Sequence, residues 1–341
     1  MKENCWKAKI SFETVPIVVQ HITPKTTLTR QYFTDKINPT TLLALTILGN
    51  NSAIPAFGRN PTAQVLQLGD ENFLIDCGEG TQLQMSKYKI RRSKVNNIFI
   101  SHLHGDHYFG LIGLLTSMSL LNRTHDLHLY GPAALKHIID FQLEVADTTL
   151  SYKLHFHPLT EEGIIADENK FTVHCFSVQH RIECWGFIFR QKKNPRSIDP
   201  IRVKAYEIPA SFYERLQKGD DYITSKGTII PNEEVTNPNT PVKSYAYCAD
   251  TIFDETICEK VQGVDLLYHE TTYLKDASDK AAARFHCTTE QAGTIAKKAA
   301  AKKLLIGHFS SRYELLDEFL AETMEIFENT EIAVEGSCFR I

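Results

Sequence analysis

The sequence predicts an α/β fold in which helices cover β-sheets. Blocks of short strand-like runs have helix-like runs between and after them, which is the pattern of sheets covered by helices. The 341 residues are 43% hydrophobic and 23% charged, so the composition is ordinary for a globular chain with a sizeable core. Three histidines and one aspartate directly follow one of the apolar runs, so a polar site is expected at the end of a strand.

The first part of the chain predicts five strands and three helices. The strands are expected at 42–48, 62–68, 72–76, 95–100 and 127–130, and the helices at 80–89, 110–121 and 133–145. Strands 62–68 and 72–76 flank a Gly-Asp turn, which predicts a hairpin. Gly131-Pro132 is expected to end the strand at 127–130.

The second part of the chain is divided by a segment of different composition. A β-rich stretch is expected at about 152–190, and after the divide strands are expected near 245–248, 266–268, 303–306 and 331–334 and helices at 288–301 and 313–327. Residues 191–241 hold six prolines, many charges and only short apolar runs, so they are expected to form an inserted, protruding arm. Residues 1–40 are irregular except for a strand-like run at 14–19. They are expected to be an N-terminal extension of unknown role before a catalytic domain at 41–341.

The composition excludes some classes of protein. Lys+Arg total 37 and Asp+Glu total 41, and the net charge of -4 argues against a wholesale nucleic-acid binder but not against a local basic patch. The apolar run at 111–121 is much shorter than the roughly 20 residues that span a bilayer, and the N-terminus has no apolar signal segment. The eight cysteines are scattered without a CxxC pair, which is typical of reduced thiols. A cytoplasmic protein without a membrane span is therefore expected.

The strongest chemical signal is the segment Ser101-His-Leu-His-Gly-Asp-His107, directly after a predicted strand. Imidazole and carboxylate groups are zinc ligands, and four of them within six positions at a strand end can converge on a metal. His102 and His104 point the same way if the strand geometry continues, whereas Asp106 and His107 follow a glycine turn and can face a second ion. The alternative reading is a polar loop that is merely rich in histidine.

Two ions need more ligands than one short loop supplies, and three later residues are candidates. His180, Asp250 and His308 each follow a predicted strand. Strand-end loops gather at one edge of an open α/β layer and build the site there. A single histidine at a strand end is more often structural than a ligand, so it is the repeated placement that indicates a shared metal site.

These residues resemble a known family. The pattern His102-x-His104-x-Asp106-His107 resembles the HxHxDH motif of the metallo-β-lactamase superfamily. More specific matches resemble the DCGEGTQ, FITHLHGDHxxGL, HEAT, HSTxxE and HxSxRY segments of ribonuclease Z, the tRNA 3′-processing endonuclease; they lie in that order at 76–82, 99–111, 269–272, 284–290 and 307–313. The combined set is far more specific than HxHxDH alone, and the resemblance runs from about residue 42 to the C-terminus.

The resemblance implies a fold and a pair of zinc ions in each subunit. The fold of the family is a four-layer αβ/βα sandwich with the metals at one edge. Carried onto this sequence, the family's ligands are His102, His104 and His180 for one zinc, Asp106, His107 and His308 for the other, and Asp250 as the bridge between them. This implied set agrees with the candidates found at the predicted strand ends.

The resemblance also implies the chemistry. Two metals can share a hydroxide and neutralise a phosphate oxygen. The hydroxide would attack the phosphorus and release the 3′ trailer of precursor tRNA, leaving a 3′-hydroxyl on the tRNA and a 5′-phosphate on the trailer. His286, oriented and kept charged by Glu270, would protonate the leaving oxygen, and Asp106 would position the nucleophile. The alternative reading of His286 is a residue at a helix start, capped by Thr288 or Thr289.

RNA contacts are predicted from loops, basic residues and the arm. The residues expected to contact the substrate are Arg59, Asn60, Ser310, Ser311, Arg312 and Lys218. The arm holds eight basic residues where the shorter ribonuclease Z proteins carry a tRNA-gripping arm, but acidic residues are interleaved and a solvated loop is the alternative. It lacks the family's Gly-Pro pair, and Phe57 replaces the lysine of the family's PxKxRN loop, so the preference for the first trailer nucleotides can differ. The basic run at 87–94 is either a further RNA contact or solvated surface.

Three classes of function follow from these patterns. The first is a zinc-dependent tRNA 3′ endonuclease, expected by resemblance to be a homodimer in which one subunit's arm serves the other's site. The second is another phosphodiesterase or hydrolase of the metallo-β-lactamase fold acting on small molecules; the arm, His286 and the segment 269–272 argue against it. The third is a non-catalytic relative, which would have lost metal ligands, whereas all seven are present.

Overall fold

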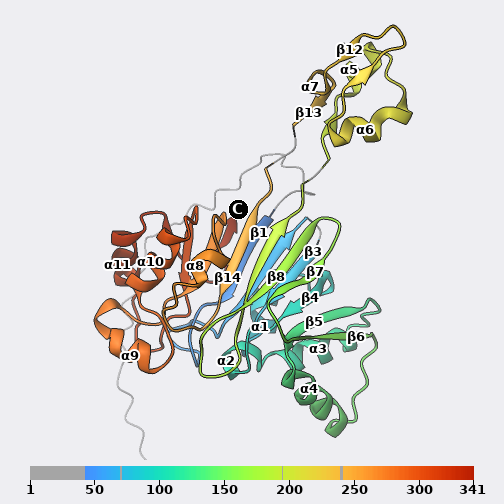
Figure 1. Ribbon diagram of the computed structural model, residues 1–341. Coiled ribbons are helices and arrows are strands. Elements are labelled where there is room, and N and C mark those ends of the chain that lie inside the picture. Colours follow the sequence, from blue (N-terminus) through green and yellow to red (C-terminus); the bar gives the residue numbers. More distant parts are fainter. Residues whose placement is uncertain (1–42, 70, 194, 239–240) are drawn as a thin grey trace, which may run out of the picture. The chain divides into compact units, whose positions relative to one another are not determined.

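The computed structural model describes residues 43–341 except 70, 194, 239 and 240. Two seven-stranded sheets face each other, and helices cover their outer faces (Figure 1). This arrangement is the four-layer αβ/βα sandwich that the family resemblance implies, in which each sheet buries one face against helices and the other against its partner sheet. The expected N-terminal extension at 1–40, with its strand-like run at 14–19, lies outside the described residues.

The first sheet has the strand order β18-β1-β2-β3-β4-β5-β6. Its strands are β1 (Leu43–Gly49), β2 (Ala63–Leu68), β3 (Glu71–Ile75), β4 (Val95–Phe99), β5 (Leu127–Pro132), β6 (Leu154–Leu159) and β18 (Cys338–Arg340). β2 and β3 pair antiparallel, which confirms the predicted hairpin. β3 to β6 run parallel, so their carboxyl ends meet at one edge of the sheet.

The second sheet has the strand order β17-β16-β15-β14-β9-β8-β7. Its strands are β7 (Gly163–Asp167), β8 (Phe171–Ser177), β9 (Trp185–Gln191), β14 (Ser244–Cys248), β15 (Leu266–Glu270), β16 (Leu304–Gly307) and β17 (Thr330–Ile332). β14 to β17 run parallel. Aromatic rings fill the space between the sheets: the Phe99 ring of β4 lies 5.4 Å from that of Phe187 and 5.3 Å from that of Phe189, both in β9.

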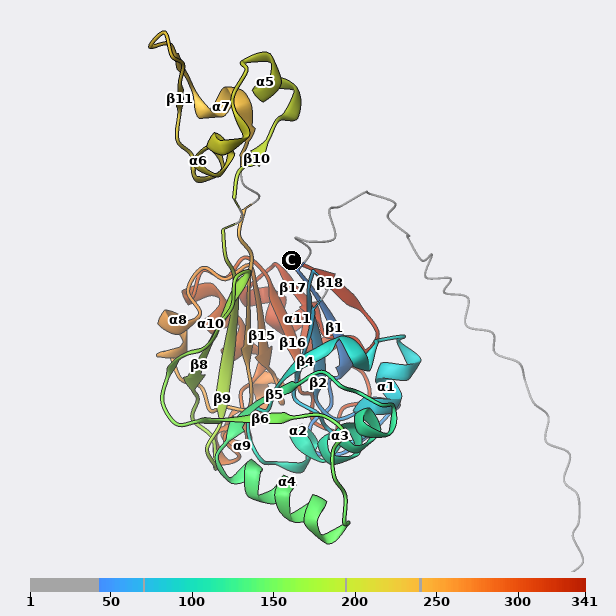
Figure 2. The same cartoon turned by 90° about the vertical axis from the view of Figure 1, so that its right-hand side faces the viewer.

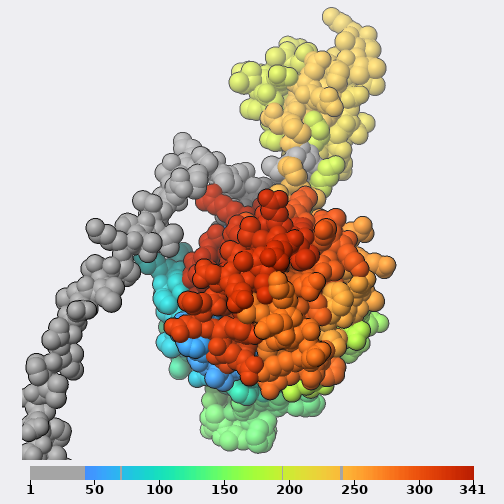
Figure 3. Space-filling view, turned by 90° about the vertical axis from the view of Figure 1, so that its left-hand side faces the viewer, coloured from blue at the N-terminus to red at the C-terminus, as the bar shows by residue number. Residues whose placement is uncertain are grey.

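Helices bury their apolar sides on the outer face of each sheet. On the first sheet these are α1 (Thr81–Lys87), α3 (Leu111–Leu120) and α4 (Ala134–Val145), and on the second α8 (Ile257–Lys260), α10 (Thr289–Lys298) and α11 (Asp317–Ile326). Figure 2 looks onto β5 and β6 with α3 and α4 close by. Figure 3 shows that the C-terminal part of the chain, orange to red, forms most of the face on the opposite side. Shorter helical turns are α2 (Gly105–Tyr108), α9 (Ser278–Ala283), η2 (Arg92–Lys94) and η4 (Lys275–Ala277).

Within the expected arm, residues 197–237 fold into small elements around their own apolar cluster. The elements are β10 (Ser197–Ile198), α5 (Pro200–Ala205), η3 (Ala210–Phe212), α6 (Tyr213–Lys218), β11 (Tyr222–Ile223), β12 (Ile229–Ile230), α7 (Asn232–Val235) and β13 (Thr236–Asn237). Val203, Leu216 and Val235 are buried in that cluster. Asp199 caps α5 by accepting backbone N–H groups, and Pro200 occupies its first turn, where proline is favoured.

Several elements differ from the prediction, among them the unpredicted short helices α8 and α9, and three of the differences have a physical reason. β5 continues through Pro132, which pairs with Leu159; proline lacks only the backbone donor, and its carbonyl still accepts. The helix predicted at 313–327 begins at Asp317, because the Arg59 side chain takes the carbonyls of Tyr313 and Glu314 as acceptors. The short strand β18, which pairs with β1, was not predicted, because three residues give no readable period.

Two compositional predictions can be compared with the described residues. The seven cysteines among them are all free, and five are buried, as expected for reduced thiols. Within the same described ranges, no helix has both the length and the apolar composition needed to cross a membrane.

Candidate metal centre

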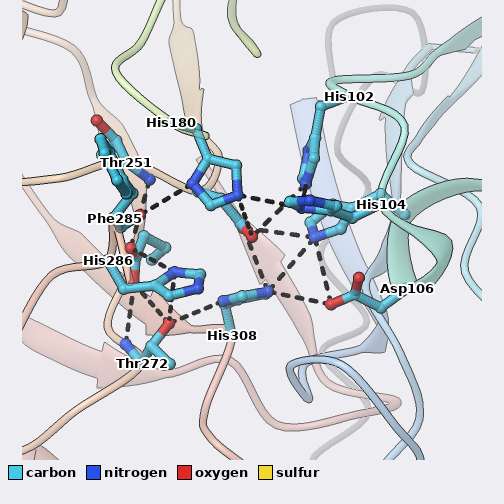
Figure 4. Close-up of polar contacts among 12 residues, drawn as sticks. His102, His104, Asp106, His180, Thr251, Thr272, Phe285, His286 and His308 are labelled. Carbon is cyan, nitrogen blue, oxygen red and sulfur yellow. Dashed lines mark hydrogen bonds and ion pairs between the residues drawn. The ribbon is translucent and has the colours of Figure 1, made fainter. Parts of the chain in front are cut away.

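Strand ends from both sheets carry the predicted site residues to one place. His102 follows β4, Asp250 follows β14 and His308 follows β16, while His180 lies in the turn between β8 and β9. Figure 4 shows these histidine rings pointing toward one another from the two sides of the sandwich. His308 has a φ of +62°, a left-handed conformation that is uncommon outside glycine and is found at functional sites.

Four predicted ligands form a first group. His102, His104, His180 and Asp250 each place one ligand atom within 4.8 Å of the others. The Nδ1 atom of His104 lies 3.1 Å from Nε2 of His102 and 3.1 Å from Nε2 of His180. In a metal-chelating site, several ring nitrogens point at the same position. This group has that geometry, so it fits a metal ion.

Three predicted ligands form a second group beside the first. Asp106, His107 and His308 also place one ligand atom each within 4.8 Å of one another. The Nε2 atoms of His107 and His308 are 3.3 Å apart, and Asp106 Oδ2 lies 3.4 Å from Nε2 of His308. Asp106 Oδ2 also accepts the backbone N–H of Ala53 at 2.6 Å, which ties the loop after β1 to the metal centre.

Asp250 lies between the two groups, with one carboxylate oxygen facing each. Its Oδ1 atom is 3.4 Å from Nε2 of His107 and 3.2 Å from Nε2 of His308. Its Oδ2 atom is 3.6 Å from Nε2 of His102 and 3.8 Å from Nε2 of His180. Asp250 is buried, and its Oδ1 accepts no hydrogen bond from a described residue. A buried anionic oxygen without a donor is costly, and a bound metal ion would satisfy it.

The ionisation states suit metal binding. Burial lowers the pKa of His102 well below its usual value and that of His180 to about 4, so both rings are neutral ligands. Burial opposes charge on Asp250, but the neighbouring histidines hold the pKa of its carboxyl well below the usual range. Burial also opposes charge on His107, yet the surrounding carboxylates raise the pKa of its ring well above the ordinary value. A metal ion that binds here must therefore displace a proton from His107.

The second ring nitrogen of four histidines is fixed by a hydrogen bond. The Nδ1 atom of His107 donates to Asp76 Oδ2 at 2.7 Å, that of His180 to the Phe285 carbonyl at 2.9 Å, that of His308 to Thr272 Oγ1 at 2.9 Å and that of His102 to Ser101 Oγ at 3.0 Å. Such contacts select the tautomer and the orientation of a ligating imidazole. All four Nε2 atoms are therefore available to metal.

Replacement of Asp76 by asparagine tests whether these hydrogen bonds orient the imidazole rings. Asp76 is fully buried and also accepts the Tyr247 hydroxyl at 2.5 Å and the Ser101 backbone N–H at 2.7 Å. The amide offers a donor where His107 needs an acceptor, so metal affinity is expected to fall roughly 10- to 100-fold. Competition with a chelator measures the effect. Unchanged affinity in Asp76→Asn would contradict the orienting role.

Glu270 and His286 form a hydrogen-bonded pair beside the predicted metal ligands. His286 Nδ1 donates to Glu270 Oε1 at 3.1 Å, and Glu270 is fully buried, with further bonds from the backbone N–H groups of Cys287 and Thr272 at 2.8 and 2.9 Å. Burial lowers the pKa of His286, but the charge and hydrogen bond of Glu270, together with the charges of Asp250 and Asp106, raise it, and the net pKa is raised. Thr288 caps α10 through a capping box with Gln291, so His286 both lies just before a helix start and contacts Glu270.

A cavity of about 410 Å³ opens onto His286 and onto several of the predicted metal ligands. Its walls come from the loop after β1, from the loop that carries the HxHxDH motif and from the turn between β8 and β9; they include His104, Asp106, Asp250 and His286. Glu79, Phe109 and Arg181 also line it but were not singled out as site residues from the sequence. Arg181 directly follows the predicted ligand His180, which is the one local signal for it.

The predicted RNA contacts fall in different environments. Arg59 is half-buried, and its guanidinium donates to Asn51 and to the Tyr313 and Glu314 carbonyls. Asn60 donates to the Glu335 carboxylate, so both residues fasten their loop to the protein. Ser310 is buried, Ser311 is half-buried and Arg312 is exposed after β16, while Lys218 is exposed on α6 of the arm and pairs with Glu214 at 2.7 Å.

The fold and the site define a class of protein, a metal-binding hydrolase of the metallo-β-lactamase fold. Solved structures agree. The short form of human tRNase Z superposes with a TM-score of 0.64 at 26% identity, covering 87% of this chain and 98% of that one. The metallo-β-lactamase fold protein YhfI from Bacillus subtilis, 19% identical, superposes with a TM-score of 0.63 over 88% of this chain and all of its own, which shows the fold alone.

The chain belongs to the ribonuclease Z family. Ribonuclease Z of Bacteroides fragilis (strain YCH46) is 42% identical over 299 residues, covering 87% of this chain and 98% of that protein. Ribonuclease Z of Cytophaga hutchinsonii is 41% identical over 300 residues, covering 87% and 96%. Residues 43–207 also match the family model described as the anti-Pycsar protein Apyc1, a match that spans less than half of the chain.

Proposed function

We propose that this chain is a zinc-dependent endoribonuclease that removes the 3′ trailer from precursor tRNA, leaving a 3′-hydroxyl on the tRNA and a 5′-phosphate on the trailer. The observation that carries the proposal is the position of Asp250 between two groups of ligands, beside the Glu270–His286 pair and an open cavity. Membership of the ribonuclease Z family supports the substrate.

Two zinc ions per subunit fit the donor set. Five imidazole nitrogens with two carboxylates suit zinc better than magnesium, which prefers oxygen ligands. The first ion would be held by His102, His104 and His180, the second by Asp106, His107 and His308, and Asp250 would serve both. When bound, such a pair of ions lowers the pKa of water and neutralises charge on a phosphate.

The protein's own groups then do three things. The neutral imidazoles and the anionic Asp250 form the binding surface. Asp106, held by the backbone N–H of Ala53, positions the attacking water. His286, kept protonated by Glu270, transfers its proton to the leaving 3′ oxygen, a general-acid role.

The test is incubation with a precursor tRNA carrying a 3′ trailer, with and without a chelator. Release of the trailer after the discriminator base that is lost on chelation and restored by zinc is the expected result. Hydrolysis of bis(p-nitrophenyl) phosphate with the precursor tRNA untouched would refute the proposal and favour a small-molecule phosphodiesterase. A chain inert on both substrates despite bound metal would favour a non-catalytic relative.

The segment 191–241 is proposed to be the arm that grips tRNA. A hollow of about 630 Å³ within it is lined by Lys193, Arg196 and Lys218, and grouped cations bind phosphates. The Lys193→Ala, Lys218→Ala double variant is expected to raise KM for precursor tRNA and to reduce the salt slope of binding by roughly one per lost contact. Lys136→Ala on α4 is the matched control. An unchanged KM and salt slope would contradict the role.

A homodimer in the cytoplasm completes the proposal. The arm precedes β14 at Ser244, whereas Asp250 follows the other end of that strand, so the arm joins the sheet at the end away from the metal ligands. An arm so connected suits the site of a second subunit. Sedimentation equilibrium at twice the chain mass, and rescue of activity on mixing an arm variant with an Asp250 variant, are the expected results; a monomer with full activity would refute it.

A further inference from the structure

Two exposed apolar side chains stand at the mouth of the metal-site cavity. Phe109 is 64% exposed and Ile54 is 56% exposed, and both line the same cavity as Asp106, Asp250 and His286. Neither belongs to the metal ligands or to the Glu270–His286 pair. Exposed apolar surface grouped beside a polar site is typical of a ligand-binding surface.

The Phe109 ring packs against Gly105, in the loop that carries the predicted metal ligands. The backbone N–H of Phe109 donates to the Gly105 carbonyl at 2.9 Å, and the ring lies so close to Gly105 that a Cβ there would be 2.2 Å from it. The next residue, Gly110, has no room for a side chain, since a Cβ would lie 2.3 Å from the Gly78 carbonyl oxygen. The ring therefore has one side on the ligand loop while most of its surface is open to solvent.

Ile54 is held on the loop after β1. Its carbonyl accepts Asn51 Nδ2 at 2.6 Å, and its backbone N–H donates to the Ser52 carbonyl at 2.8 Å. The preceding Ala53 has a φ of +65° and donates to Asp106. The loop that presents Ile54 is thus tied to the same ligand loop that presents Phe109.

We propose that Phe109 and Ile54 form an apolar clamp for a nucleobase next to the scissile phosphate. The proposal rests on the proposed function, because a phosphodiester held in the cavity by the metal site places a flanking base at its mouth. Every base has a π face that stacks on an aromatic ring, and stacking tolerates any sequence. A clamp of this kind orients the RNA chain without restricting the enzyme to one tRNA.

The first experiment is single-turnover cleavage of precursor tRNA. Phe109→Ala is expected to lower kcat/KM roughly 5- to 150-fold, the range for loss of one stacked base. Its metal content should not change. Phe109→Trp, which keeps an aromatic ring, is expected to keep the wild-type kcat/KM. Phe141→Ala, which removes a ring of similar exposure (65%) on α4, is expected to behave as wild type. A substrate abasic at the discriminator or at the first trailer position should lose the same factor with wild type and lose nothing further with Phe109→Ala.

Full activity of Phe109→Ala, or an undiminished abasic penalty in it, would overturn the clamp. A second measurement does not depend on cleavage: the indole introduced by Phe109→Trp should be quenched by a single-stranded oligoribonucleotide and not by its abasic analogue, with wild type as background. Quenching in a chain that leaves precursor tRNA intact would refute the proposed function and keep the clamp. Cleavage without quenching and without a rate loss would refute the clamp and keep the function.

Discussion

Asp250→Ala is expected to lower kcat/KM for precursor tRNA by at least about 1,000-fold, because metal catalysis contributes several kcal/mol and each 1.36 kcal/mol is a factor of ten. One oxygen of Asp250 faces His107 and His308, and the other faces His102 and His180. Loss of the carboxylate therefore weakens both groups of ligands at once. Elemental analysis of metal per subunit, alongside the kinetics, measures the effect.

Thermal unfolding separates the loss of a ligand from misfolding. Chelation should lower the Tm of the wild type, because metal bound only by the native state stabilises it, whereas Asp250→Ala should respond little. Asp140→Ala is the control, since it breaks only an exposed ion pair with Lys136 on α4, which is worth little. Full metal content in Asp250→Ala, or a rate within about tenfold of wild type, would contradict the bridging role.

The residues that converge at the candidate metal centre could be predicted because their signal is either local or tied to strand ends. The HxHxDH motif supplies His102, His104, Asp106 and His107 within one short loop, and parallel strands bring later strand-end residues to the same edge. The sequence does not show that His104 faces the site through Nδ1 and His102 through Nε2. That choice depends on where the chain turns from β4 into α2.

The residues that hydrogen-bond to the candidate ligands, and the residues that contact the substrate, were harder to predict. The side chains with which they interact are distant in the sequence. Asp76 was known only as part of a motif, and its place behind His107 depends on pairing of β3 with β4. Arg59 and Asn60 were predicted to contact RNA, but their side chains also hold residues more than 250 positions away. The sequence pattern alone cannot distinguish an arginine that anchors a loop from one that binds a phosphate.

His286→Ala is expected to lower the rate of precursor tRNA cleavage about 10²- to 10⁴-fold, the usual contribution of a general acid. His286 is nine-tenths buried, lines the cavity, and is bound through Nδ1 to Glu270, which leaves Nε2 to protonate the departing 3′ oxygen. The loss should be far smaller on bis(p-nitrophenyl) phosphate, because an acidic nitrophenol leaves without protonation. Rates on the two substrates with the same enzyme preparation make the comparison.

Two further variants decide whether His286 donates a proton or supports the metal ligands. Glu270→Gln removes the charge that raises the pKa of His286, so it should show the same dependence on the leaving group with a smaller loss. His137→Ala, an exposed histidine of α4, should match wild type on both substrates. Equal losses on both substrates in His286→Ala would assign the residue to the metal centre instead, since a weakened centre slows attack on the phosphorus whatever group departs. The ratio of the two losses therefore reports proton donation, which neither loss alone can do.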